Sequence, residues 1–159
     1  MATSAMVTQI SPFKAIAKAM EHPYMNIVEA SITQVDDKNL RFDLHVNSLI
    51  PERPSSDYLA LIFGLDLNSN NIFNEFPPDL NLRVGFDYRS GWFGIVDGAP
   101  TAGGTSFKYT ISGSSLTFLI PLELVGNISQ FKWQVSTLES TRQSQLPGDN
   151  LPWQLLYLK

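Results

Sequence analysis

Residues 58 to 65 read Tyr58-Leu59-Ala60-Leu61-Ile62-Phe63-Gly64-Leu65, and this apolar run stops abruptly at Asp66-Leu67-Asn68. A strand that is apolar on both faces belongs in the middle of a sheet, where both faces are covered. The oxygen-rich segment that follows should therefore lie at the rim of the sheet, where side chains can meet a cation or a ligand. The run predicts a central strand with a candidate site at its end.

On both sides of this run, apolar and polar residues alternate. The clearest case is residues 40–47, where Leu40, Phe42, Leu44 and Val46 alternate with polar side chains. Further strands are expected over residues 28–33, 82–88, 92–96, 107–111, 116–120, 131–135 and 153–157. Most of them alternate in the same way, with turn residues between them. This period of two is typical of a sheet that has one buried face and one wet face.

About nine short strands with no βαβ rhythm predict an all-β fold, an antiparallel β-sandwich of the jelly-roll or immunoglobulin-like kind. One short N-terminal helix is expected after Ser11-Pro12, because Phe13, Ile16, Ala17 and Met20 then share one helical face. A chain of 159 residues fits one domain. We expect an N-terminal segment over residues 1–24 and the β-sandwich over residues 25–159.

Composition argues against several classes of partner. Eleven basic and fifteen acidic residues give a net charge of −4, and no stripe of Lys and Arg is present, so we expect no nucleic-acid partner. The absence of cysteine excludes a disulfide framework, a thiolate nucleophile and a zinc–thiolate site. No run approaches the ~20 apolar residues of a membrane span, and the N-terminus lacks a signal-peptide pattern.

Oxygen-bearing side chains near predicted strand ends indicate a calcium site. Calcium takes six to eight oxygen ligands at about 2.3–2.6 Å. The candidate ligands are Asp66, Asn68, Asn70, Asp87 and Asp149. This interpretation requires that residues 66, 87 and 149 meet at one edge of the two stacked sheets. The sequence leaves open that Asp66, Asn68 and Asn70 instead accept backbone hydrogen bonds in a turn, and that Asp87 faces plain solvent.

Carbohydrate recognition requires aromatic faces that stack on sugar C–H surfaces, with polar groups around them for the hydroxyls. Trp92, Trp153 and Tyr88 are the candidate ligand-binding residues. Trp133 alternates with Phe131 and Val135 and is expected in the core. Burial in the core is also the alternative for Trp92 and Trp153, since burying such a side chain is itself stabilising.

Catalysis has less support, and we predict no catalytic residue. The chain has no G-x-S-x-G, H-E-x-x-H, P-loop or G-x-G-x-x-G motif. His45 lies on a polar strand face and is expected at the surface, and His22 follows the predicted helix. Glu75 and Asp79 could form a carboxylate pair if their long loop folds over a pocket, and a mobile acidic loop is the alternative.

Several motifs occur in an order found in a known superfamily. They are the turn Asp36 to Asn39, the strand that ends in Asp66-Leu67-Asn68, Gly85-Phe86-Asp87-Tyr88, residues 116–126 with a Pro-Leu-Glu-Leu-Val-Gly ending, and Asp149-Asn150-Leu151-Pro152. Over residues 25–152 the chain resembles the DOMON-like β-sandwich domains, which are similar to the family 9 carbohydrate-binding modules. The chain lacks the Thr-Gly that members carry after the first acidic motif, and Trp153 replaces their final acid.

This resemblance implies an extracellular or periplasmic protein, while the missing signal peptide leaves a cytoplasmic location open. Residues and resemblance together predict a non-catalytic, calcium-stabilised binding module for a carbohydrate or another surface or small-molecule ligand. Two alternatives remain at this stage. One is a small β-sandwich enzyme with Asp66, Asp87 or Glu75 as general acid in an apolar pocket, and the other is a structural or assembly domain. The sequence leaves the oligomeric state open.

Overall fold

The computed structural model describes residues 8–10, 22–67, 79–98, 104–126, 128–146 and 148–159. Over these residues the order of elements is β1 (Thr8–Ile10), η1 (Pro23–Met25), β2 (Ile27–Gln34), β3 (Asn39–Val46), β4 (Tyr58–Asp66), β5 (Leu80–Asp87), β6 (Gly91–Gly98), β7 (Thr105–Ser106), β8 (Thr110–Ser112), β9 (Ser115–Pro121), η2 (Leu122–Val125), β10 (Gln130–Ser140), β11 (Gln145–Leu146) and β12 (Gln154–Tyr157). The two η elements are short 3-10 helices.

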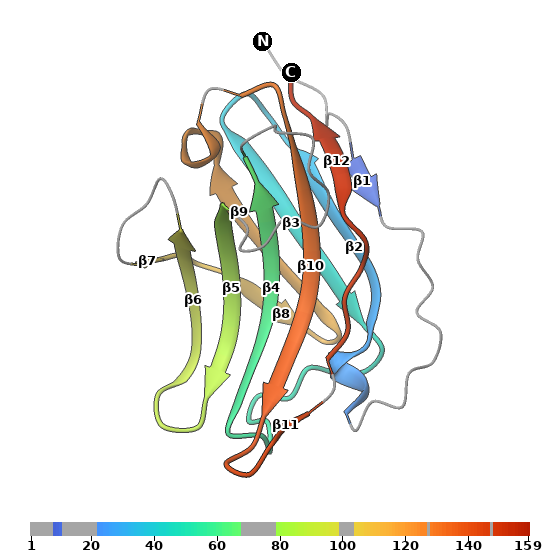
Figure 1. Cartoon of the computed structure of the whole chain (residues 1–159), viewed down its shortest axis with the longest axis vertical. Coiled ribbons are helices and arrows are strands. Elements are labelled where there is room, and N and C mark those ends of the chain that lie inside the picture. Colours follow the sequence, from blue (N-terminus) through green and yellow to red (C-terminus); the bar gives the residue numbers. More distant parts are fainter. Residues whose placement is uncertain (1–7, 11–21, 68–78, 99–103, 127, 147) are drawn as a thin grey trace.

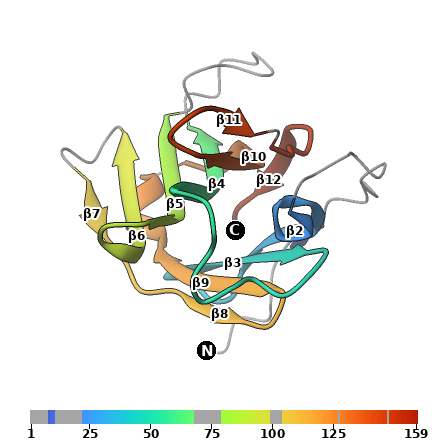
Figure 2. The same cartoon turned by 90° about the horizontal axis from the view of Figure 1, so that it is seen from below.

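The strands form two antiparallel sheets that face each other. One has the order β1-β2-β3-β9-β8, and the other has the order β11-β10-β4-β5-β6-β7 with β12 also paired to β10. Figure 1 shows the seven-stranded sheet in front of the five-stranded one, and Figure 2 shows both layers from below. The predicted all-β antiparallel sandwich is confirmed.

The strands that sequence alternation missed are short. β1, β7 and β11 have three, two and two residues, too few to display a period of two. β1 pairs with β2, so residues 8–10 of the expected N-terminal segment are part of the sandwich. The predicted helix after Ser11 lies outside the described residues. Among those that are described, no helix is long and apolar enough to cross a membrane.

β4 is the middle strand of its sheet, as the apolar run predicted. It pairs along its whole length with β10 and along most of it with β5. Its residues Leu59, Leu61, Phe63 and Leu65 are at most 1% exposed and point into the sandwich. The alternate positions, which include Tyr58 and Ile62, therefore point to the outer face of the sheet.

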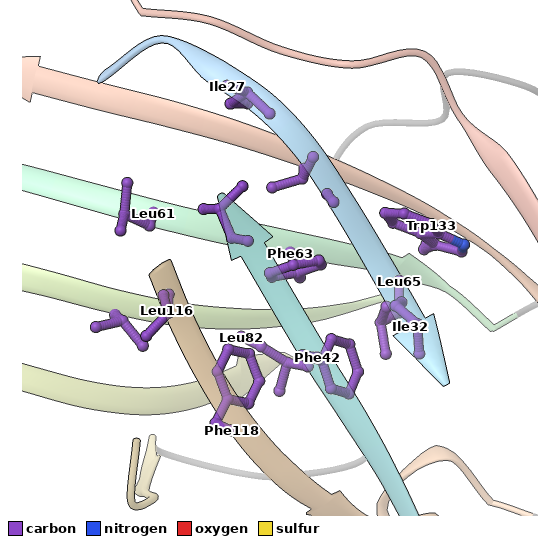
Figure 3. Packing of buried hydrophobic residues seen from close by; sticks show 14 of the residues in the cluster. Ile27, Ile32, Phe42, Leu61, Phe63, Leu65, Leu82, Leu116, Phe118 and Trp133 are labelled. Atoms are coloured by element: carbon purple, nitrogen blue, oxygen red, sulfur yellow. The ribbon is translucent and has the colours of Figure 1, made fainter. Parts of the chain in front are cut away.

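Aromatic rings join the two sheets in the core (Figure 3). Phe42 of β3 stacks on Phe118 of β9 with 4.9 Å between ring centroids. Phe42 also meets Phe63 of β4 edge to face at 5.1 Å. Trp133 is fully buried beside Phe63, which confirms its predicted core position. Such contacts add to the stabilisation from area burial.

We predict that Phe63→Ala lowers the free energy of unfolding by about 3–5 kcal/mol, because it leaves a cavity at the contact between the sheets. Leu119→Ala is the control, since Leu119 is 53% exposed, and should change stability by at most about 0.5 kcal/mol. Urea unfolding of both variants measures the difference. Equal losses would contradict this account of the core.

Candidate functional site

The structure separates the acids that were predicted to bind one calcium ion. Asp66 ends β4 and Asp87 ends β5, and the antiparallel ladder pairs Tyr58 with Asp87 and Leu65 with Leu80. Eight residue steps along β4, at about 3.3 Å each, therefore place roughly 26 Å between Asp66 and Asp87. The prediction that these acids meet is wrong, because antiparallel pairing puts the C-terminal ends of successive strands at opposite ends of the sheet.

Asp149 lies away from both ends and stabilises the fold. It is 2% exposed, and its backbone carbonyl accepts a hydrogen bond from the amide of Thr137, in the middle part of β10. Its Oδ2 accepts a hydrogen bond of 2.9 Å from the amide of Ile27, where β2 begins. Asp149 therefore ties β2 to β10 and does not join Asp66 or Asp87 in a shared site.

Asp87 has a structural role in a turn. Its Oδ1 accepts a 2.8 Å hydrogen bond from the amide of Arg89, which closes the turn between β5 and β6. Asp and Asn side chains commonly hold such turns.

Asp66 is 2% exposed and lies directly opposite Lys132 in the ladder between β4 and β10. Beside it, Asp79 accepts a 2.6 Å hydrogen bond from the amide of Leu67. Asn68 and Asn70 lie outside the described residues, and within the described part of the chain no group of three or more His, Cys, Asp or Glu side chains could hold a metal ion. The five predicted ligands therefore do not form one calcium site. Calcium binding stays a prediction for Asp66 alone among the three acids.

A thermal melt tests this reduced prediction. Calcium at 100 times its Kd should add about 2.7 kcal/mol of stability and raise Tm by roughly 5–11 °C, and a chelator should reverse the rise. Asp66→Asn should abolish the response, whereas Asp87→Asn should keep it. A Tm that calcium and chelator leave unchanged would contradict calcium binding.

The three predicted ligand-binding aromatics do not share one surface. Trp92 packs against Phe86 at 5.7 Å between ring centroids and donates its indole N–H to the carbonyl of Glu52 at 2.8 Å. Trp153 is half-buried and precedes β12, whose Gln154 is the register partner of Trp133. Tyr88, 37% exposed, lies with Trp92 at the end of the sheet where β5 turns into β6. Trp153 is therefore separate from the other two.

Ligand-type side chains do gather on the outer face of the seven-stranded sheet. Phe93 of β6 is the register partner of Gly85 of β5. A Cβ on Gly85 would come within 2.6 Å of the Phe93 ring, so the missing side chain allows that ring to lie over β5. There Phe93 meets Tyr58 of β4, with 6.3 Å between centroids and 32° between ring planes.

Arg83 completes this group. Its Nη1 donates a 3.1 Å hydrogen bond to the hydroxyl of Tyr58, and its Nη2 donates one of 3.0 Å to Asp97. Its guanidinium carbon lies 6.0 Å from the centroid of the Phe93 ring. The side chains of Arg83 and Asp97 are 33% and 36% exposed, so both reach solvent. We call Tyr58, Arg83, Phe93 and Asp97 the outer-face platform.

Sequence analysis missed the platform although part of its signal was present. Arg83 and Gly85 alternate with the apolar residues Leu82 and Val84, and this alternation alone places Arg83 on the outer face. Tyr58 and Phe93 lie in runs that are apolar on both faces, where a period of two cannot assign a side. The register of β4, β5 and β6 was needed to bring the four residues together.

A second polar cluster closes one end of the sandwich. Glu139 of β10 is 1% exposed, and its Oε2 lies 2.6 Å from Nδ1 of His22 and accepts hydrogen bonds from Tyr24 and Ser56. The rings of His22 and Tyr24 stack at 5.0 Å. Burial raises the pKa of Tyr24 above its ordinary value, and the charge of Glu139 raises it further. This cluster joins η1, the loop before β4 and β10.

We predict that stability falls as the pH rises above about 10. A raised pKa means that folded Tyr24 holds its proton more tightly than unfolded Tyr24, so its contribution is complete below pH ~10 and is lost as pH rises through the folded pKa. Tyr24→Phe should make the loss of stability with pH shallower. Tyr157→Phe is the control, since Tyr157 is 53% exposed, and it should leave the slope unchanged. Urea unfolding between pH 8 and 11 measures both slopes, and identical slopes in all three proteins would contradict the assignment.

The outer face of the five-stranded sheet carries a histidine. His45 is exposed, as predicted, and its Nδ1 lies 3.1 Å from Ser115 Oγ and 3.2 Å from Ser114 Oγ. A shallow groove of about 270 Å³ runs beside it, lined among others by Glu29 and Asp43. Its described lining residues include no Phe, Tyr or Trp, so the groove lacks the pair of large aromatic rings that the platform has.

Comparison of the chain with family models, with curated proteins and with solved structures finds no match. The functional argument therefore depends on the geometry of the described residues.

Proposed function

We propose that this protein is a non-catalytic binding module that holds a saccharide on the outer-face platform. The observation that carries the proposal is the meeting of Tyr58 and Phe93 on one sheet face, with Arg83 hydrogen-bonded between Tyr58 and Asp97. Aromatic faces provide an apolar surface for the C–H groups of a sugar ring. The guanidinium and the carboxylate beside them supply a donor and an acceptor for its hydroxyls.

The platform is also held in position before any ligand arrives. Gly85 leaves room for the Phe93 ring, and Arg83 is fixed by two hydrogen bonds to side chains on neighbouring strands. Side chains that are ordered in advance lose less conformational entropy when a ligand binds. A rigid strand surface with fixed rings therefore supports a binding role.

Two buried carboxylates have structural roles, which favours binding over acid–base catalysis. Oε2 of Glu139 is contacted by three side chains, and the side chain of Asp149 accepts hydrogen bonds from the amides of Ile27 and Asn150. Asp87, a general acid in the enzyme alternative, closes a turn. Their hydrogen bonds account for these carboxylates without a reaction.

Affinity gel electrophoresis against a panel of soluble polysaccharides, followed by calorimetry on the best ligand, tests the proposal. Tyr58→Ala and Phe93→Ala should each weaken binding at least tenfold, which is about 1.4 kcal/mol, because each removes a stacking face. Tyr157→Ala is the matched control. Tyr157 is exposed and pairs with Gln130, ten residues along β10 from the partner of Tyr58, so its removal should leave affinity unchanged.

Thermal melts of all three variants establish that they are folded. A ligand whose affinity is the same for wild type, Tyr58→Ala and Phe93→Ala would contradict the assignment to the platform. Absence of binding to the whole panel by folded wild-type protein would contradict the saccharide-binding function.

A further inference from the structure

Beside the platform, two arginines enclose an exposed aromatic ring. The guanidinium carbons of Arg89 and Arg142 lie 5.1 and 5.4 Å from the centroid of the Tyr88 ring. Arg89 also donates a 2.7 Å hydrogen bond from Nε to the Tyr88 hydroxyl. The three residues come from two turns, one between β5 and β6 and the other between β10 and β11. We call them the arginine clamp.

The strand register places the clamp next to the platform. Tyr58 pairs with Asp87 on one side and with Ser140 on the other, and Tyr88 directly follows Asp87. The amide of Tyr88 donates a 2.9 Å hydrogen bond to the carbonyl of Asp57, the residue before Tyr58. In Figure 1 the β5–β6 and β10–β11 turns both lie at the lower end of the sheet, where β4 begins. A ligand that leaves the Tyr58 ring in this direction meets the clamp.

Arginine side chains are concentrated in the platform and the clamp, and the acids Asp57 and Asp87 lie beside the clamp. The chain has a net charge of −4, yet three of its five arginines, Arg83, Arg89 and Arg142, belong to the platform and the clamp. Arg83 is paired with Asp97. Within the described part of the chain, no ion pair involves Arg89 or Arg142. Their contacts with Tyr88 position the two guanidiniums and leave N–H donors available.

We propose that the clamp makes the module specific for acidic saccharides, and this inference rests on the proposed function. The uncharged faces of the sugar rings lie on Tyr58 and Phe93. The carboxylate of a uronic acid unit in the same saccharide binds Arg89 and Arg142. A planar guanidinium matches a carboxylate through paired N–H donors, and charge-assisted bonds of this kind are roughly twice as strong as neutral ones. A neutral saccharide has no charged group to pair with these two guanidiniums.

A matched pair of polymers tests the inference. Polygalacturonate and its fully methyl-esterified form share a backbone and differ in charge. Wild-type protein should bind the acidic polymer at least tenfold more tightly, and this preference should shrink as NaCl is raised, because salt screens exposed charges. The double variant Arg89→Gln/Arg142→Gln should lose the preference and keep its affinity for the esterified polymer.

Two further variants test whether the preference depends on the planar guanidinium groups and on these two arginines in particular. Arg89→Lys/Arg142→Lys retains the charge without the planar fork and should retain only part of the preference. Arg41→Gln removes a comparably exposed arginine from the five-stranded sheet, where Arg41 pairs with Asp43, and should bind both polymers like the wild type. Thermal melts confirm that each variant is folded.

The outcomes separate the two proposals. Equal affinity for both polymers, unaffected by the clamp variants but lowered by Tyr58→Ala, would overturn the acidic specificity and support the platform. Competition by inorganic sulfate alone that depends on Arg89 and Arg142, with no effect of Tyr58→Ala on either polymer, would identify a free-anion site and overturn the inference. A glycan array of neutral, uronic and sulfated polymers completes the test. Hits confined to neutral polymers would overturn the inference, and no hits at all would overturn both proposals.

Discussion

The pairing of β4 with β10 and β5 is the constraint on which the rest of the structure depends. Because Leu61, Phe63 and Leu65 must face Phe42 and the core, Tyr58 and Ile62 are forced to the outer face. A slip of one residue would exchange the two sets and expose the core side chains. The same ladder sets the distance between Asp66 and Asp87 and the neighbourhood of Tyr58 and Phe93. Packing in the core thereby determines what the solvent-facing surface presents.

Two buried carboxylates connect the sheets to neighbouring segments. Glu139 is hydrogen-bonded to His22, Tyr24 and Ser56. Asp149, beside β10, accepts a hydrogen bond from the first residue of β2. Oε2 of Glu139 and both carboxylate oxygens of Asp149 accept hydrogen bonds, which offsets the cost of removing them from water. These carboxylates connect segments that are distant in the sequence, so they fix the positions of η1 and β2 relative to β10.

The platform and the clamp use the same chemistry in two electrostatic settings. In the platform, Asp97 balances Arg83, and the guanidinium is fixed between a hydroxyl and a carboxylate. In the clamp, Tyr88 orders two guanidiniums that form no ion pair with any residue the structure describes. In the function proposed above, the platform would hold a sugar ring and the adjoining turns would hold an anion. An acidic saccharide would combine both features in one ligand.

Alternating patterns such as Leu40–Val46 were enough to predict the antiparallel sandwich. The apolar run at Tyr58–Leu65 predicted its central strand, and alternation with Phe131 and Val135 predicted the buried Trp133. Both signals are local, since each strand records in its own residues which face is buried. The calcium set failed because the relation between residues 66, 87 and 149 depends on strand direction and register, which no single segment carries. Tyr58, Arg83, Phe93 and Asp97 could not be grouped from the sequence for the same reason, because pairing among three strands and the absence of a side chain at Gly85 bring them together. The sequence by itself determined the strands and most of their apolar core positions, and only the tertiary structure decided which acids are buried and which exposed residues meet.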